Sequence, residues 1–167
     1  MILKKVCLLG ATAVGKTSLV RRFVKGVFSD QYLTTVGVKI DKKDIDTASG
    51  PLSLILWDLS GEDEFTQIET RYLSGAAGYI LVADRTRPET LDQAFELDAR
   101  AAGAIGRRPR VLVLNKADLE DCMPPEKLDA ARERGLSLLS ASAKTGDGVE
   151  DMFATLAGKL ADGAEDA

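Results

Sequence analysis

Short apolar runs of strand length alternate along this chain with amphipathic segments of helical period. Such alternation is typical of an α/β domain with a mostly parallel sheet, because each helix returns the chain to the start of the next parallel strand. The apolar runs that predict buried strands are Val6 with Leu8 and Leu9, and residues 52–57, 79–83, 111–114 and 136–139.

Two of the expected helices have clear apolar faces. Leu19 and Phe23 lie four residues apart after the first strand, and apolar residues recur at spacings of four, three and four over 149–160. Asp147 is followed three residues later by Glu150, a pattern that predicts a capping box at the start of the last helix. Both helices are expected to pack on the sheet.

One pair of strands breaks the parallel rule. The runs at 38–46 and 52–57 are joined only by residues 47–51, a link too short for a parallel crossover, so a hairpin is predicted. The 38–46 run is rich in Lys and Asp, which suits an exposed sheet edge because charges there discourage aggregation. We expect one antiparallel edge strand, to which a partner could add.

Composition narrows the class of protein. The 167 residues predict one globular domain over 1–162 and a short acidic tail over 163–167. A net charge of −4 disfavours nucleic acid as a partner. Two cysteines, Cys7 and Cys122, and the absence of histidine argue against a disulfide scaffold or a zinc site. The apolar N-terminal run is too short to cross a membrane, so we expect a reduced, cytoplasmic protein.

The segment 10–17 reads GATAVGKT, which matches G-x-x-x-x-G-K-[ST] between an apolar strand and an amphipathic helix. In that context backbone N–H groups converge on phosphate oxygens at a helix N-terminus, while Lys16 supplies a positive charge. The Thr17 hydroxyl can bind Mg²⁺. A glycine-containing turn without a ligand also explains this pattern, so its meaning depends on the other motifs.

Two later motifs follow apolar strands directly, at the strand ends where ligands bind in open α/β sheets. In NKAD at 115–118, the Asp118 carboxylate can accept hydrogen bonds from N1–H and the 2-amino group of guanine, whereas adenine offers no matching donors. Lys116 can lie over the purine face and Asn115 can tie this loop to the phosphate loop. In SAK at 142–144, the Ala143 N–H can read guanine O6. Each motif alone is more often an ordinary polar turn.

The segment DLSG at 58–61 also follows a strand. It places the Asp58 carboxylate where a Mg²⁺ shell needs one and the Gly61 N–H near a terminal phosphate. Thr35, in a polar loop, offers a hydroxyl to the same metal, and Phe28 can stack on the base. A strand-ending turn explains DLSG equally well, and a lone Phe is usually a core residue.

Together and in this order, these motifs resemble the Ras superfamily of small GTPases, most closely its Rab-like branch, over nearly the whole chain. The motifs that carry the resemblance are GATAVGKT at 10–17, TVGV at 35–38, WDLSG at 57–61, NKAD at 115–118 and SAKTG at 142–146. The resemblance implies a monomeric protein with the three-layer P-loop NTPase fold of small G proteins, a six-stranded, mostly parallel sheet with one antiparallel edge strand and five flanking helices. The expected activity is GTP and GDP binding with Mg²⁺ and slow GTP hydrolysis, with switch regions at about 29–38 and 59–75. It also implies an effector, an exchange factor and an activating protein that bind those regions.

The resemblance assigns roles to individual residues. The residues expected to contact the phosphates are Ala13, Val14, Gly15, Lys16, Thr17, Ser18, Thr35 and Gly61, and those expected to bind Mg²⁺ are Thr17, Thr35 and Asp58. The residues expected around guanine are Phe28, Asn115, Lys116, Asp118, Ser142, Ala143 and Lys144. Hydrolysis is expected to involve Lys16, Thr35, Gly61 and Glu62.

Glu62 departs from the family, which usually has glutamine directly after Asp-x-x-Gly. An ionised glutamate cannot donate a hydrogen bond and its charge opposes the γ-phosphate, yet it is the stronger acceptor for a water proton, so its effect on hydrolysis is left open. One alternative is a GTP-binding scaffold with little hydrolysis, and another is an ATP-dependent enzyme, which Asp118 opposes. The sequence ends without a cysteine, a CaaX box or a basic run. Two interpretations fit this end: a longer natural chain of which this is a part, or a GTPase without a lipid anchor, as in prokaryotic relatives of the family, and we favour the second.

Overall fold

The computed structural model describes residues 2–29, 38–59 and 70–163, and strands and helices alternate over these residues as the apolar pattern predicts. Six strands and five helices lie within the described residues, as expected. In chain order they are β1 (Ile2–Leu9), α1 (Lys16–Lys25), β2 (Val38–Thr47), β3 (Gly50–Leu59), α2 (Thr70–Leu73), β4 (Gly78–Asp84), α3 (Glu89–Ile105), β5 (Arg110–Asn115), α4 (Pro125–Glu133), β6 (Ser137–Ser140) and α5 (Val149–Ala161).

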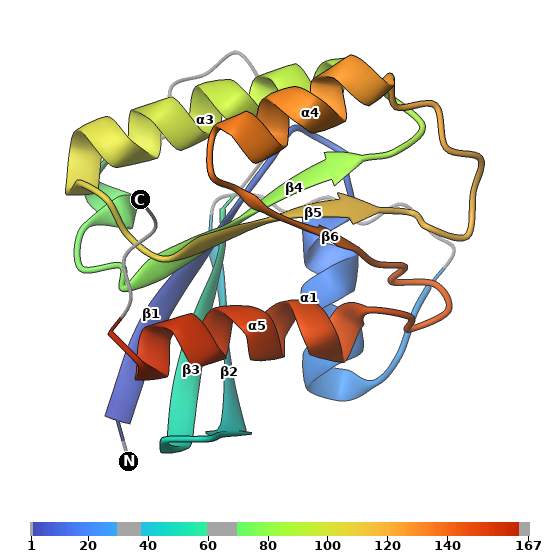
Figure 1. The fold of residues 1–167 in the computed structure, drawn as a ribbon. Coiled ribbons are helices and arrows are strands. Elements are labelled where there is room, and N and C mark those ends of the chain that lie inside the picture. The colour runs from blue at the N-terminus through green and yellow to red at the C-terminus, as the bar shows by residue number, and fades with distance from the viewer. Residues whose placement is uncertain (1, 30–37, 60–69, 164–167) are drawn as a thin grey trace.

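The strands form one sheet in the order β2-β3-β1-β4-β5-β6 (Figure 1). All neighbouring pairs are parallel except β2 and β3, which run antiparallel from the pair Val38–Leu59 to the pair Thr47–Gly50. The hairpin therefore has a two-residue turn at 48–49, and Gly50, which directly follows it, has a φ of 114°, which favours glycine. The expected antiparallel edge strand is confirmed.

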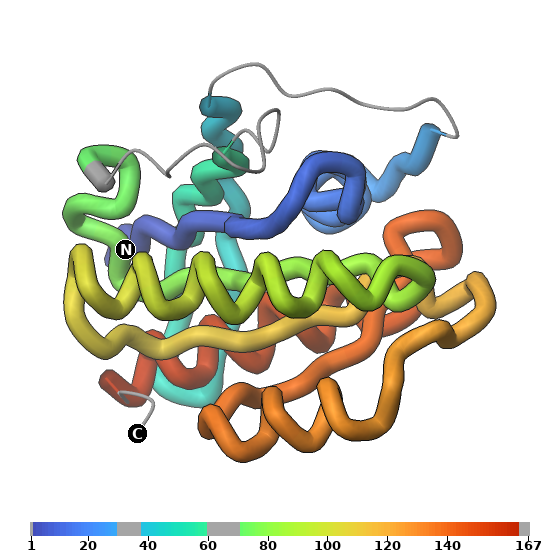
Figure 2. The backbone as a smooth tube through the Cα atoms, turned by 90° about the horizontal axis from the view of Figure 1, so that it is seen from above, coloured from blue at the N-terminus to red at the C-terminus, as the bar shows by residue number. Residues whose placement is uncertain are grey.

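Two apolar layers cover the two faces of the sheet. Val6 and Leu8 of β1 pack on the side of α1 and α5, whereas Cys7 and Leu9 pack on the side of α3 and α4. Figure 1 shows these helix pairs below and above the sheet, and in the turned view of Figure 2 α3 and α4 lie in front of the strands and α5 behind them. Within the described residues, no helix has the length and apolar character of a membrane span.

The start of α5 differs from the sequence expectation. Gly148 occupies the N-cap with a φ of 73°, and no side chain caps the helix, so the predicted capping box of Asp147 and Glu150 is wrong. Asp147 instead belongs to the turn before the helix, where its carbonyl accepts the Ser142 N–H at 2.8 Å. A Cβ at Gly148 would lie 2.1 Å from the Ser140 carbonyl oxygen, so this close turn excludes a capping side chain at that position.

Candidate functional site

The loops that carry the motifs meet at the carboxyl edge of the parallel strands, toward which the β4 and β5 arrows point in Figure 1. The GATAVGKT loop joins β1 to α1, NKAD begins at the last residue of β5, and SAK lies between β6 and α5. Asp58 is the penultimate residue of β3. The topology thus brings together four segments that lie far apart in the sequence.

Side chains hold five successive carbonyl groups of the GATAVGKT loop. Three of the donors come from other segments of the chain, so the loop conformation depends on tertiary contacts. The contacts are Lys16 Nζ to the Gly10 (2.7 Å) and Ala11 (3.2 Å) oxygens, Arg87 Nη2 to the Thr12 oxygen (2.9 Å), Lys116 Nζ to the Ala13 oxygen (3.1 Å), and Asn115 Nδ2 to the Val14 oxygen (2.9 Å).

These contacts fix the direction of the loop's N–H groups. In a trans peptide the C=O and the following N–H point to opposite sides, and no described peptide bond is cis. The carbonyls of residues 12–14 are anchored from other segments of the chain, which turns the N–H groups of residues 13–15 away from those anchoring side chains. The chain reverses at Ala13 and Gly15, whose φ angles are 66° and 98°, and no side chain caps α1. Such an arrangement leaves N–H donors available to an anion at the N-terminus of α1.

Lys16 is folded back into its own loop. The side chain is buried, and burial lowers the pKa of its ammonium group to about 8, an effect that the nearby Asp58 carboxylate partly offsets. Its hydrogen bonds go to two carbonyl oxygens, which are uncharged acceptors. A phosphate oxygen is a stronger acceptor for an ammonium group, so this lysine is poised to exchange carbonyl contacts for a phosphate.

Thr17 and Asp58 form a pair of oxygen donors. The Thr17 hydroxyl donates to Asp58 Oδ2 at 2.5 Å, and the Asp58 side chain is fully buried. Mg²⁺ prefers oxygen ligands and is commonly held by one or two carboxylates together with phosphates and water. No group of three His, Cys, Asp or Glu side chains gathers in the described part of the chain. The donors present fit a magnesium ion that is shared with a bound phosphate, and no all-protein metal cage is needed.

Asn115 links the NKAD loop to the GATAVGKT and SAK loops. Its Nδ2 donates to the Val14 carbonyl, and its Oδ1 accepts the Ala143 N–H at 3.3 Å. The expected tie between the NKAD and phosphate loops is therefore present. The approach requires glycine, because a Cβ at Gly15 would lie 2.2 Å from Asn115 Nδ2.

Asp118 and Ser142 form the second link between the base motifs. The Ser142 hydroxyl is buried, donates to Asp118 Oδ1 at 2.7 Å and accepts the Thr145 N–H at 3.1 Å. Asp118 itself is exposed, so its carboxylate is oriented by a neighbour yet open to a ligand. The adjoining Lys144 carbonyl is held by Arg22 of α1 at 2.8 Å.

Sequence reasoning missed a buried carboxylate, Asp84, at the end of β4. Its Oδ2 accepts hydrogen bonds from Lys116 at 2.8 Å and from Arg87 at 3.1 Å, the same two cations that hold the Ala13 and Thr12 carbonyls. Burial alone would raise the pKa of Asp84, but hydrogen bonds from Lys116, Thr86 and Arg87 lower it to about 2. The position of Asp84 at a strand end was the available signal, because the NKAD and DLSG motifs occupy equivalent strand ends.

The remaining expected residues fall into two groups. Ser18 lies in the first turn of α1, and Phe28 packs against the apolar layer of α1 and α5, so its side chain has the core contacts that a lone Phe usually makes. Thr35, Gly61 and Glu62 lie outside the described residues, as do most of the two expected switch regions.

Comparisons with known proteins agree on one family. A sequence model of the family described as "Ras family" matches residues 5–162 of this chain. The chain is 33% identical over 157 residues to the Ras-related protein Rab-13 of Canis lupus familiaris, which covers 92% of this chain and 77% of that protein. It is 35% identical over 158 residues to the Ras-related protein SEC4 of Saccharomyces cerevisiae, with 92% and 73% covered. The Ras-related protein Rab-4 of Dictyostelium discoideum is 34% identical over 157 residues, with 92% and 77% covered.

Proposed function

Because the chain belongs to the Ras family of small GTPases, we propose that it binds GTP and GDP at the carboxyl edge of its sheet and acts as a slow, nucleotide-dependent switch. The observation that carries this proposal is the double contact of Asn115, which joins a phosphate-type loop to both guanine-type motifs. A strand-ending turn without a ligand has no need for such a junction.

The phosphate groups are assigned to the loop of residues 13–18. The N–H groups of this loop, which point away from the side chains that anchor its carbonyls, donate to the phosphate oxygens together with the N–H groups at the start of α1. Lys16 leaves the Gly10 and Ala11 carbonyls to contact the same oxygens. Because the N–H groups are already oriented, they neutralise the charge that develops during hydrolysis without rearranging, whereas Lys16 changes its contacts when the phosphate binds.

Thr17 and Asp58 are the proposed magnesium ligands within the described residues. The hydroxyl would bind the ion directly, and the Asp58 carboxylate would contact it through water and balance its charge. When bound, Mg²⁺ supplies neutralisation of the terminal phosphate charge. Thr35 is proposed as a further ligand in the GTP state.

Guanine selection is assigned to Asp118 and to the Ala143 N–H, which would share its hydrogen between Asn115 Oδ1, its acceptor at 3.3 Å, and guanine O6. Asp118 accepts the two donors on the guanine edge, and Ser142 orients it. Lys116 lies against the purine face, with Lys144 beside the base. Phe28 is only partly buried in the core, and its remaining exposed surface is assigned to the base. Adenine would leave the carboxylate without donors, which favours guanine over adenine.

The proposed switch regions are those at about 29–38 and 59–75, with Gly61 contacting the γ-phosphate. An effector, an exchange factor and an activating protein bind there, and the protein is a monomeric, cytoplasmic G domain over 1–162. Glu62 orients the attacking water in this proposal. The alternative, a GTP-binding scaffold with little hydrolysis, is favoured by the same residue because a carboxylate repels the γ-phosphate.

Competition binding tests the nucleotide assignment. A fluorescent GDP analogue is bound in Mg²⁺ buffer and displaced by GTP, GDP, ATP or ADP. We expect guanine nucleotides to compete at concentrations at least about 100-fold lower than adenine nucleotides, since two charge-assisted hydrogen bonds are at stake. Equal competition by ADP and GDP would revive the ATP-dependent alternative.

Glu62→Gln separates the switch with slow hydrolysis from the scaffold. A rise in single-turnover GTP hydrolysis of more than about tenfold would mean that the native glutamate restrains catalysis, as the scaffold alternative requires. Loss of hydrolysis would support Glu62 as the group that orients water. Exposed Glu120, outside the motif, provides the matched control as Glu120→Gln.

A further inference from the structure

Arg87 contacts the phosphate loop from a segment that none of the motifs includes. It lies between β4 and α3, and its side chain is 36% exposed. The guanidinium fork makes two contacts at once: Nη2 donates to the Thr12 carbonyl at 2.9 Å, and Nε donates to Asp84 Oδ2 at 3.1 Å. The planar fork of arginine suits such a bridge, whereas a lysine presents a single ammonium point.

Asp84 anchors this bridge rigidly. The carboxylate is 1% exposed, and it also accepts the Thr86 N–H at 2.9 Å and the Thr86 hydroxyl at 2.6 Å. Its Oδ2 is shared with Lys116, which holds the next carbonyl of the loop, that of Ala13. One buried acid therefore fixes two cations, and those cations fix two consecutive peptide groups.

The consequence falls on specific N–H groups. Anchoring the Thr12 carbonyl sets the plane of the peptide that carries the Ala13 N–H, and anchoring the Ala13 carbonyl does the same for the Val14 N–H. Ala13 has a φ of 66°, a conformation that non-glycine residues rarely adopt, so the loop needs outside support there.

We propose that Arg87 is a positioning residue for the nucleotide phosphates, acting through the Thr12 carbonyl and sharing the Asp84 anchor with Lys116. The inference rests on the proposed binding of guanine nucleotides to this loop. Arg87 is linked to the NKAD motif through the Asp84 oxygen that it shares with Lys116. Recognition of the guanine 2-amino group is assigned to Asp118, so we expect Arg87 to affect phosphate binding and not the discrimination based on that amino group.

The test measures dissociation of GDP and of inosine diphosphate, which lacks the 2-amino group, from wild type and from Arg87→Gln. Loss of one hydrogen bond to the loop predicts about tenfold faster dissociation of both nucleotides, so that the ratio of the two rates is unchanged. Arg87→Lys keeps the charge but cannot span both acceptors, and we expect an intermediate rate. Exposed Arg100, on α3, gives the control Arg100→Gln, with rates equal to wild type.

Other outcomes of this test count against the proposal. Wild-type rates in Arg87→Gln overturn it. A changed ratio between the two nucleotides also overturns it, because the substitution would then act on the base site as well. Urea unfolding of each variant separates these results from loss of folding. Failure of the wild-type protein to retain GDP at all would instead defeat the proposed function.

Discussion

Truncating Asp118 to alanine is expected to remove the recognition of guanine while leaving the phosphate site intact. In the described structure the carboxylate is exposed and Ser142 orients one of its oxygens at 2.7 Å. Two hydrogen bonds from guanine to a charged acceptor would be lost. Such bonds contribute roughly 1.5–3 kcal/mol each, and because the free carboxylate is well hydrated we take the lower value for each. The sum of about 3 kcal/mol corresponds to about 150-fold weaker binding.

The assay for this variant is competition of GDP and inosine diphosphate against a fluorescent GDP analogue. Inosine diphosphate keeps N1–H but lacks the 2-amino donor, so wild type should prefer GDP by about tenfold or more and Asp118→Ala should show no preference. Glu120→Ala, two residues along the same loop, should behave as wild type. A loss of GDP affinity below about threefold, or a persistent preference for GDP in Asp118→Ala, would refute the assignment of the base to Asp118.

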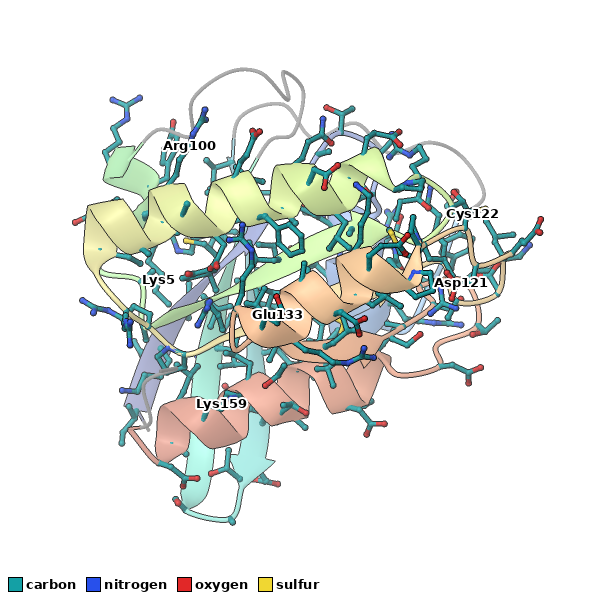
Figure 3. All side chains as sticks on the ribbon, turned by 45° about the horizontal axis from the view of Figure 1, so that its top comes forward. Lys5, Arg100, Asp121, Cys122, Glu133 and Lys159 are labelled. Atoms are coloured by element: carbon teal, nitrogen blue, oxygen red, sulfur yellow. The ribbon has the colours of Figure 1, made fainter. Side chains whose placement is uncertain are left out.

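Three further predictions concern stability and reactivity. Phe153→Ala should lower the unfolding free energy by about 3–5 kcal/mol in urea titrations, because Phe153 is fully buried and its ring centroid lies 3.9 Å from that of Phe23. A loss below about 1 kcal/mol would contradict this packing account. Cys122 is exposed (Figure 3), whereas burial raises the pKa of the Cys7 thiol to about 11. An alkylating reagent should therefore label only Cys122 in the native protein, as measured by peptide mass spectrometry. Rapid labelling of Cys7 would be inconsistent with its burial. The pKa of Asp84 is about 2, below its value in the unfolded chain, so the ionised group should add roughly 2 kcal/mol to the free energy of unfolding. That contribution should be present above about pH 4 and lost as the pH falls toward 2. Asp84→Asn should weaken this acid dependence of the unfolding free energy, and an unchanged dependence would count against the shift.

The fold followed from the sequence because local pattern and topology agree. Val6 and Leu8 pack on one face of β1 and Cys7 and Leu9 on the other, and a continuous apolar run is what a strand covered on both faces requires. The Lys- and Asp-rich strand proved to be the antiparallel edge because charged side chains are tolerated where a face stays in water.

The candidate site was only partly predictable. Asn115 and Lys16 belong to motifs whose spacing encodes their chemistry, and Asn115 makes the tie expected of it. Asp84 and Arg87 belong to no such motif, since their role arises from contacts with residues far away in the sequence, such as the Thr12 carbonyl that Arg87 holds. The capping box failed for a related reason: the tight turn before α5 demands glycine at 148, which local pattern alone does not reveal.

The most direct test of the central claim is a single-turnover measurement. The protein is loaded with GTP and Mg²⁺, free nucleotide is removed, and the bound nucleotide is followed by chromatography over hours. We predict that guanine nucleotide is retained and that GTP converts slowly to GDP on the protein. Retained GTP without conversion would contradict intrinsic hydrolysis and favour the scaffold, and the absence of retained guanine nucleotide would contradict the account as a whole.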